Sequence, residues 1–289
     1  MLKILPCLDS EEMANSRKQE LNIPRSVAVT LGHSAVSAAK LGEYIYGENQ
    51  KVDWSQQVQT ACAATISIPP EAPLPPRKNN NHPKTRIQVT NETTFGAAER
   101  LVDRGLKPLA LNFANGAFPG GGFLNGARAQ EEVLCRSSAL FQTINGDVMY
   151  EEHSKRHGPD STNWTIYSPD VPVFRTDWGI ALSQPWLLSF LTCAAPYVPV
   201  IGQPESGNLL QQRIFRVLDI ARSYGYQTLI LGAWGCGAFG NDTKRTAGDF
   251  RQALETEFQG DFSDIVFAIT DWSPERRFLG PFRDTFSSE

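Results

Sequence analysis

From about residue 86 onwards, the spacing of hydrophobic positions alternates between the patterns of strands and helices. Helices are predicted at 94–104, 130–144, 208–226 and 243–258. Apolar or β-branched runs bounded by turn residues predict strands at 86–91, 108–115, 163–168, 171–176, 228–233 and 264–270. The apolar run 186–195 fits either a buried strand or a short helix. Because strands alternate with helices, the pattern favours a three-layer α/β fold.

The first third of the chain is more irregular. Helices are predicted at 9–20 and 34–47, and residues 68–86 form a stretch rich in proline, asparagine and positive charge. Such a stretch cannot bury a core and is typical of an exposed linker or a long loop. We therefore expect an N-terminal extension at 1–85, followed by the main domain at 86–289.

Composition narrows the class of protein. The 289 residues are 41% hydrophobic and 20% charged, as in ordinary soluble globular proteins, and no apolar run approaches the length of a membrane helix. The N-terminus does not resemble a signal peptide, and the five cysteines are an odd number without a CxxC pair. We expect a protein that is not secreted and lies in the cytoplasm, or in the nucleus if the source is eukaryotic.

Net charge limits how a phosphate ligand could be bound. The formal charge is −4, so bulk electrostatic capture of a polyanion and direct, sequence-specific binding of nucleic acid are not expected. Any phosphate must instead be held locally by backbone N–H groups and a few side chains.

The first candidate site is the loop 112–132, which follows one predicted strand and precedes a predicted helix. The triplet at 120–122 removes three side chains, which would let a ligand lie against bare backbone. Glu131 and Glu132 then begin the helix. An ordinary turn followed by acidic residues in the first helical turn is the alternative. The combination of Asn115, the glycines and the glutamate pair makes that alternative less attractive.

A glutamate pair at this place suits glycosidic chemistry. Cleaving a glycosidic bond requires a carboxylic acid that protonates a poor leaving group, and its pKa must be raised by burial or by a nearby like charge. The helix dipole acts in the opposite direction, so the sequence leaves the pKa open. Neighbouring residues on a helix point about 100° apart, and the two glutamates therefore have different roles.

The second candidate site is the loop 231–242, where Gly235, Gly237 and Gly240 form a GxGxxG between a strand and a helix. A dinucleotide-binding Rossmann motif is the alternative, but it normally opens the first half of a longer fold. We favour a loop that cradles a diphosphate with backbone amides. Two glycine loops at the carboxyl ends of strands would share one cleft, which suits ADP-ribose.

These two runs resemble a known family. The run from Gly120 to Glu132, GGG followed by seven residues and QEE, resembles the signature of poly(ADP-ribose) glycohydrolases, and Trp234 to Gly240 resembles their diphosphate-binding loop. The context looks like the microbial branch, and the resemblance covers about residues 86–271. It implies a macrodomain-like three-layer α/β/α fold with a mixed sheet, a mostly helical N-terminal extension and a catalytic domain at 86–289.

The resemblance also implies roles for single residues. Glu132 looks like the acid/base, Glu131 would orient the ribose hydroxyls, and Asn115 would bond the distal ribose. Phe239 would pack against that ribose. The other residues expected to bind substrate are Gly120, Gly121, Gly122, Gln130, Gly235, Cys236, Gly237, Ala238 and Gly240, with Asn112 less secure. The aromatic residue that stacks on adenine stays open among Trp272, Phe278 and Phe282.

The implied function is hydrolysis of the ribose–ribose O-glycosidic bonds of poly(ADP-ribose) on modified proteins, with ADP-ribose as product. No cofactor, metal or membrane partner is implied. One alternative is a hydrolase that removes a single ADP-ribose from protein or nucleic acid. The other is a non-catalytic protein that binds ADP-ribose, which the glutamate pair disfavours because a binding pocket needs no acid.

Other chemically active residues have simpler interpretations. His153 and His157 lie four apart, as metal ligands on a helix can, but their charged segment breaks at Gly158 and favours a solvated loop or helix end. Cys135 has the spacing of a core residue. Cys236 has no histidine nearby in sequence to act as its base.

Overall fold

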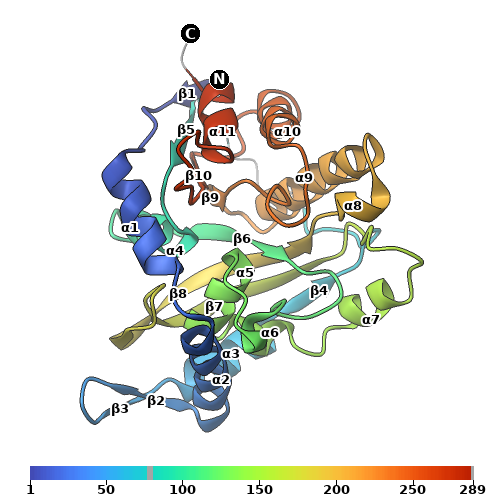
Figure 1. The fold of residues 1–289 in the computed structure, drawn as a ribbon. Helices are drawn as coiled ribbons and strands as arrows, with labels where there is room; N and C mark the ends of the chain where they lie inside the picture. The colour runs from blue at the N-terminus through green and yellow to red at the C-terminus, as the bar shows by residue number, and fades with distance from the viewer. Residues whose placement is uncertain (77–80, 288–289) are drawn as a thin grey trace.

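An eight-stranded mixed sheet is the framework of the protein in the computed structural model, which describes residues 1–76 and 81–287. In the described chain the strand order is β1-β5-β10-β9-β6-β8-β7-β4 (Figure 1). The strands from β1 to β8 in this order run parallel, and β7 and β4 are antiparallel to their neighbours. The bounds are β1 Leu2–Ile4, β4 Ile66–Ile68, β5 Thr85–Thr90, β6 Pro108–Ala114, β7 Thr165–Arg175, β8 Ala181–Ala194, β9 Thr228–Leu231 and β10 Asp264–Ala268.

Helices cover both faces of this sheet. Figure 1 shows α9, α10 and α11 on one side and α2, α3, α5 and α6 on the other. The helix bounds are α1 Glu11–Leu21, α2 Arg25–Leu41, α3 Ser55–Ala64, α4 Thr94–Val102, α5 Gln130–Ser137, α6 Leu140–Ile144, α7 Val148–Ser154, α8 Val198–Ile201, α9 Glu205–Ser223, α10 Thr243–Glu255 and α11 Leu279–Thr285, with a 3-10 turn η1 at Phe123–Asn125.

Alternating residues of the central strands feed two separate cores. On β9, Leu229 and Leu231 pack towards α9 and α10, whereas Ile230 packs into the cluster on the opposite face. The same alternation occurs on β10, where Phe267 lies in the first cluster and Val266 in the second. Parallel strands buried on both faces are therefore nearly all apolar, as their sequences are. The predicted three-layer α/β fold with a mixed sheet is confirmed.

Three boundaries differ from the sequence prediction. The segments 163–168 and 171–176 are one strand, β7, with a bulge between them, and 186–195 belongs to the longer strand β8. The predicted helix 130–144 is broken into α5 and α6. The break occurs because Ser138 forms a bridge to Val173 of β7.

The predicted helix 34–47 is wrong at both ends. Helix α2 already begins at Arg25 and ends at Leu41, because Gly42 takes a left-handed conformation with φ of 74°. The following residues form a hairpin of β2 (Glu43–Tyr46) and β3 (Gln50–Asp53).

The first 85 residues join the main sheet at both of its edges. Strand β1 pairs with β5, and β4 pairs with β7, so the sheet crosses the expected boundary at residue 85. The division into an extension and a catalytic domain stays a prediction. Of the expected linker 68–86, residues 77–80 lie outside the described residues, while Ala72 and Leu74 pack against the core. No helix within the described ranges is long and apolar enough to cross a membrane.

Candidate functional site

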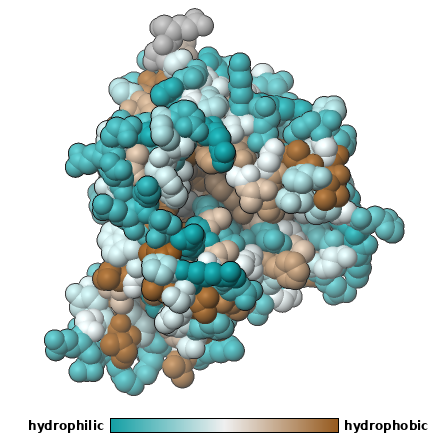
Figure 2. All heavy atoms as spheres, viewed as in Figure 1, coloured by the Kyte–Doolittle hydropathy of each residue, from teal (hydrophilic) through white to brown (hydrophobic). Residues whose placement is uncertain are grey.

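A cleft of about 380 Å³ opens at the edge of the sheet where the parallel strands end. Residues that follow β5, β6, β8, β9 and β10 form its walls, together with the first turn of α5. Figure 2 shows a hollow with an apolar interior on the face in view. The carboxyl ends of parallel strands are the usual ligand site of an open α/β sheet.

Glu131 is a buried carboxylate at one end of this cleft. Its Oε2 accepts a hydrogen bond from the Asn115 N–H at 2.7 Å, and its Oε1 accepts one from Asn112 Nδ2 at 3.3 Å. Only 3% of the residue is exposed. Burial raises the pKa of Glu131 to about 8, assisted by the adjacent Glu132, although the hydrogen bond from Asn115 acts in the opposite direction. This carboxyl group therefore keeps its proton near neutral pH.

Glu132 lies beside Glu131 and is held by the glycine triplet. Its Oε1 accepts a hydrogen bond from the Gly122 N–H at 3.0 Å, while its Oε2 accepts none from the described residues. A methyl group on Gly121 would lie 2.5 Å from Glu132 Oε1. Glycine is needed there because the loop passes directly over both carboxylates.

The glycine triplet contacts the two glutamates and does not line the cleft. Gly120 also gives a backbone hydrogen bond to Glu131, and none of the three glycines lines the cleft. The N–H groups of Gly120 and Gly122 are bonded to the carboxylates and that of Gly121 to the Phe118 carbonyl, so direct contact of the triplet with a ligand stays a prediction.

Asn115 lines the cleft and begins the turn that leads to the triplet. Its Oδ1 accepts hydrogen bonds from the N–H groups of Ala117 at 2.8 Å and Phe118 at 2.9 Å. Its Nδ2 donates to no described residue and could bond a ligand.

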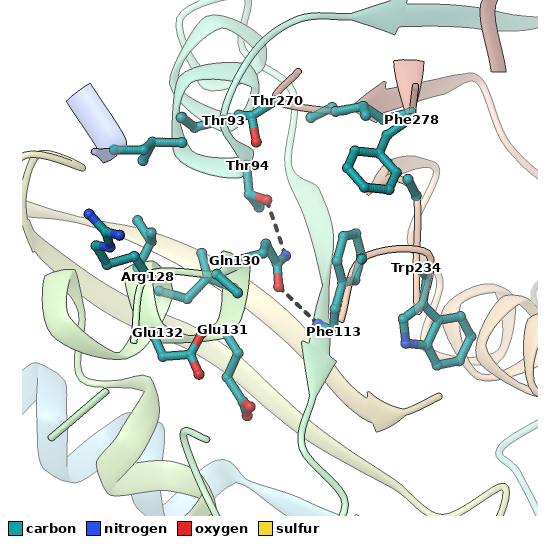
Figure 3. A pocket seen from close by; sticks show the side chains of 18 of the residues that line it. Thr93, Thr94, Phe113, Arg128, Gln130, Glu131, Glu132, Trp234, Thr270 and Phe278 are labelled. Atoms are coloured by element: carbon teal, nitrogen blue, oxygen red, sulfur yellow. Dashed lines mark hydrogen bonds between the residues drawn. The ribbon is translucent and has the colours of Figure 1, made fainter. Parts of the chain in front are cut away.

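Gln130 lines the cleft, but its amide group is used within the protein. Its Oε1 accepts from the Phe113 N–H at 2.9 Å, and its Nε2 donates to Thr94 Oγ1 at 3.1 Å and to the Leu111 carbonyl (Figure 3). Gln130 therefore ties α5 to β6 and α4. These bonds position the helix that carries the glutamates, and a direct contact of Gln130 with substrate stays a prediction.

The second glycine loop presents unpaired backbone amides. Gly237, Ala238 and Phe239 line the cleft, and their N–H groups donate to no acceptor in the described chain. Gly235 also lines the cleft, and Asn241 fixes it by donating from Nδ2 to the Gly235 carbonyl. Successive free amides form a concave anion site. The sequence predicted this loop but not the part played by Asn241.

Two residues of this loop do not reach the cleft. The Cys236 N–H donates to the Ala233 carbonyl at 3.1 Å, and its side chain is buried. The Gly240 N–H donates to the Gly237 carbonyl at 3.0 Å. The turn uses these two amides to close itself and neither residue lines the cleft, so the expected ligand contacts of Cys236 and Gly240 stay predictions. Burial also raises the pKa of the Cys236 thiol to about 11, which leaves it unreactive.

Phe239 lines the cleft next to the free amides. Its carbonyl accepts a hydrogen bond from the Val198 N–H at 2.9 Å, and its ring packs edge-on against Tyr197 with centroids 5.6 Å apart. The ring is therefore held in place by the β8–α9 connection.

Aromatic residues also line the cleft, and Figure 3 shows Phe278 away from the glutamates. Phe278 and Trp272 are both among the lining residues, whereas Phe282 is fully buried in the core and is excluded as a ligand contact. Asp271 accepts hydrogen bonds from the N–H groups of Phe278 and Leu279 and so fixes this turn. Figure 3 shows Phe113, which the sequence did not single out, between Phe278 and the glutamates.

Asp177 is a second buried carboxylate that lines the cleft. Its Oδ2 accepts a hydrogen bond from Thr93 Oγ1 at 2.7 Å, and its Oδ1 is buried without a partner in the described residues. Burial raises the pKa of Asp177 to about 6. No local pattern points to Asp177, because 84 residues separate it from Thr93.

The expectation that His153 lies in a solvated segment is wrong. The residue is buried, and its two ring nitrogens lie 3.0 Å from the Gly116 carbonyl and 2.8 Å from Thr162 Oγ1. The carbonyl can only accept, so Nδ1 carries the proton. Thr162 Oγ1 also accepts from the Trp164 N–H. The imidazole therefore holds the glutamate loop at Gly116, and burial lowers the pKa of His153.

Metal ligands are not gathered at the cleft. His157 is exposed and does not share a site with His153. Across residues 1–76 and 81–287, no group of three or more His, Cys, Asp or Glu side chains is arranged to hold a metal ion.

Comparison with known proteins places this geometry in a family. A family model described as the catalytic domain of microbial-type poly(ADP-ribose) glycohydrolase (PARG) matches residues 33–176. None of the curated proteins searched matches the chain.

Solved structures of poly(ADP-ribose) glycohydrolases are similar to this chain over more of its length. The crystal structure of poly(ADP-ribose) glycohydrolase from Thermomonospora curvata is similar with a TM-score of 0.82 and 36% identity, covering 89% of this chain and 98% of that one. Its complex with the inhibitor ADP-HPD has a TM-score of 0.81 and 37% identity over the same shares. The enzyme from Deinococcus radiodurans in complex with ADP-ribose has a TM-score of 0.73 and 37% identity, covering 79% of this chain and 96% of that one.

Proposed function

This chain belongs to the microbial-type poly(ADP-ribose) glycohydrolases, and we propose that it hydrolyses the ribose–ribose O-glycosidic bonds of poly(ADP-ribose) with Glu132 as the acid/base. The product is ADP-ribose, and the substrate is the polymer carried by modified proteins. The observation that supports this most is the pair of buried glutamates beneath the glycine triplet at one end of the cleft.

The glutamate pair has the properties that glycoside hydrolysis needs. Glu132 is fixed through Oε1 by the Gly122 N–H, and its other oxygen is available to the leaving oxygen and then to water. Burial raises the pKa of Glu131 to about 8, assisted by the adjacent Glu132, so a protonated carboxyl group lies beside the proposed acid/base near neutral pH. Glu132 would deliver a proton to the leaving oxygen and afterwards take one from the attacking water.

Glu131 is proposed to orient the distal ribose. It is anchored from the protein side by Asn112 and by the Asn115 N–H. A protonated carboxyl group can donate a hydrogen bond to a ribose oxygen, which an ionised carboxylate cannot. Asn115 Nδ2 and the Phe239 ring would complete the contacts with that ribose.

The rest of the cleft suits the remainder of ADP-ribose. The free amides of Gly237, Ala238 and Phe239 would bind the diphosphate, which a chain of net charge −4 cannot attract by bulk charge. Phe278 and Trp272 also line the cleft and would face the adenine. A reducing compartment such as the cytoplasm is proposed, because all five cysteines are free.

The test is turnover by the unmutated protein on poly(ADP-ribose) and on mono-ADP-ribosylated protein, together with its affinity for ADP-ribose by calorimetry. We expect release of ADP-ribose from the polymer to be the preferred reaction. Preferred turnover of the mono-modified protein would identify a mono-ADP-ribosyl hydrolase instead. Tight binding without any turnover would identify a protein that only binds ADP-ribose.

A further inference from the structure

Phe118 stands out on the loop that holds the glutamates. Its side chain is 66% exposed, which makes it the most exposed aromatic residue among those described. It does not line the cleft, which begins at Asn115 and the glutamates, so it lies on the rim outside. A single exposed phenylalanine is ordinary in itself, so what distinguishes Phe118 is its place on the loop that holds the glutamates.

The backbone around Phe118 is fixed, so the ring is presented from a defined place. Its N–H donates to Asn115 Oδ1 at 2.9 Å, and its carbonyl accepts from the Gly121 N–H at 2.9 Å. Pro119 follows and restricts the chain further. The residue therefore sits at the corner of a turn that is hydrogen-bonded on both sides.

The same turn holds both carboxylates. Asn115 donates its N–H to Glu131, and Gly122 donates its N–H to Glu132. Phe118 lies between these two anchors in sequence. It is thus displayed on the loop that anchors both carboxylates, beside the place where the proposed bond cleavage occurs.

The chemistry of the polymer indicates which group would lie near Phe118. A cleft of about 380 Å³ is at the small end of ligand pockets, with room for one ADP-ribose unit, so the unit beyond the scissile bond must lie outside it. The leaving oxygen is the 2′ oxygen of an adenosine ribose. The adenine of that leaving unit is attached to the neighbouring carbon, and so it must lie close to the glutamates and to the rim.

We propose that Phe118 forms a binding subsite for the leaving ADP-ribose unit by stacking its ring on the adenine of that unit. This inference rests on the proposed function. Stacking needs no positive charge, which suits a chain of net charge −4 that binds a polyanion. The subsite binds polymer substrate but not the free ADP-ribose product, which occupies the cleft alone.

The test compares Phe118→Ala and Phe118→Trp with the unmutated protein. Loss of a base–aromatic stack should lower kcat/KM on poly(ADP-ribose) by about fivefold or more in Phe118→Ala, whereas Phe118→Trp should retain it. ADP-ribose affinity and the thermal unfolding midpoint should not change in either variant. Tyr46→Ala, an exposed aromatic residue on the β2–β3 hairpin, is the matched control.

The outcomes separate this inference from the function on which it rests. Wild-type kcat/KM on the polymer in Phe118→Ala would overturn the subsite and leave the proposed function intact. Weaker ADP-ribose binding in Phe118→Ala, or an equal loss on mono-ADP-ribosylated protein, would also overturn it, since neither ligand carries a leaving adenine. Absence of polymer hydrolysis by the unmutated protein would remove the proposed function, and the subsite with it.

Discussion

The two glycine-rich loops of the cleft, 112–132 and 231–242, look alike in sequence but use their backbone amides in opposite ways. In the first loop the N–H groups of Asn115 and Gly122 are bonded to the glutamates. In the second loop the N–H groups of Gly237 and Ala238 have no acceptor within the described chain. These amides of the first loop are already hydrogen-bonded within the protein, whereas those of the second loop are available to an acceptor on a ligand.

The glycines differ in the same way. A methyl group on Gly121 would lie 2.5 Å from Glu132 Oε1, but a methyl group on Gly237 would meet no atom within 4 Å. Gly121 is required by the protein itself, and the open space at Gly237 is available to a ligand. Glycine-rich loops therefore have to be distinguished by what surrounds them, because composition alone assigns them the same role.

The largest effect is expected when the acid is removed from the first loop, and this tests whether the two loops have different roles. Glu132→Gln keeps the size of the side chain but cannot transfer a proton, so kcat on poly(ADP-ribose) should fall by about 10²–10⁴. ADP-ribose affinity should change little, because the second loop supplies the diphosphate contacts. Glu255→Gln on the exposed face of α10 is the control. Full activity in Glu132→Gln would show that another group is the acid.

Alanine substitutions at Gly121 and Gly237 separate the two loops. Gly121→Ala must displace the Glu132 carboxylate, and a shift of about 1 Å can lower kcat by about a hundredfold. Gly237→Ala should leave the free protein as stable as before and weaken ADP-ribose binding by about tenfold, equivalent to about 1.4 kcal/mol. Steady-state kinetics and calorimetry measure the two effects. If both variants lost the same parameter, the proposed division of work between the loops would be wrong.

Titration of Glu131 in the first loop should make the free energy of unfolding depend on pH. Its pKa is about 8 in the folded protein against 4.5 as a free group, so between these values the folded state holds a proton that the unfolded state has released. Raising the pH from 5 to 8 should therefore lower the free energy of unfolding, by up to about 1.4 kcal/mol per pH unit. Urea unfolding at several pH values measures this slope.

Glu131→Gln should flatten that slope above about pH 6, because the amide does not titrate, whereas burial raises the pKa of Asp177 to about 6 and that group contributes at lower pH. Cys236→Ala in the second loop should leave it unchanged, since burial raises the pKa of that thiol to about 11, outside the range tested. A slope that persists unchanged in Glu131→Gln would assign the titration to a different group.

The smallest expected effect concerns the support of the first loop by His153. An asparagine amide can replace Nδ1–H and keep the bond to the Gly116 carbonyl, whereas a glutamine amide reaches the position of Nε2. We expect His153→Gln to lower kcat by about fivefold, the loss of roughly one hydrogen bond, with KM unchanged. His153→Asn should stay near the wild-type value. Equal kinetics in the two variants would mean that the bond to Gly116 does not position the loop.

Much of the fold and of the site could be predicted from local patterns. The strands β6, β9 and β10 were predicted as short buried runs, because strands covered on both faces carry apolar side chains throughout. The glutamate pair and both glycine loops were found for a similar reason. Their residues are close in sequence, and their spacing expresses the chemistry directly.

Other features depend on how distant segments meet. Phe278 and Phe282 are four residues apart and equally apolar, yet one lines the cleft and the other is in the core. Their difference is set by Asp271, which bonds the backbone at Phe278 and fixes the turn before α11. No pattern of hydrophobic positions contains that information.

By itself, the sequence determined the order of the elements, the family and the loops that carry chemistry, because these depend on near neighbours along the chain. The tertiary structure decided which amides are free, that His153 supports the glutamate loop, and that the buried carboxylate of Asp177 lines the cleft. Gly116 is 37 residues from His153, and Thr93 is 84 residues from Asp177. Hydrogen bonding and burial are properties of the folded surroundings, and only the packed sheet brings such partners together.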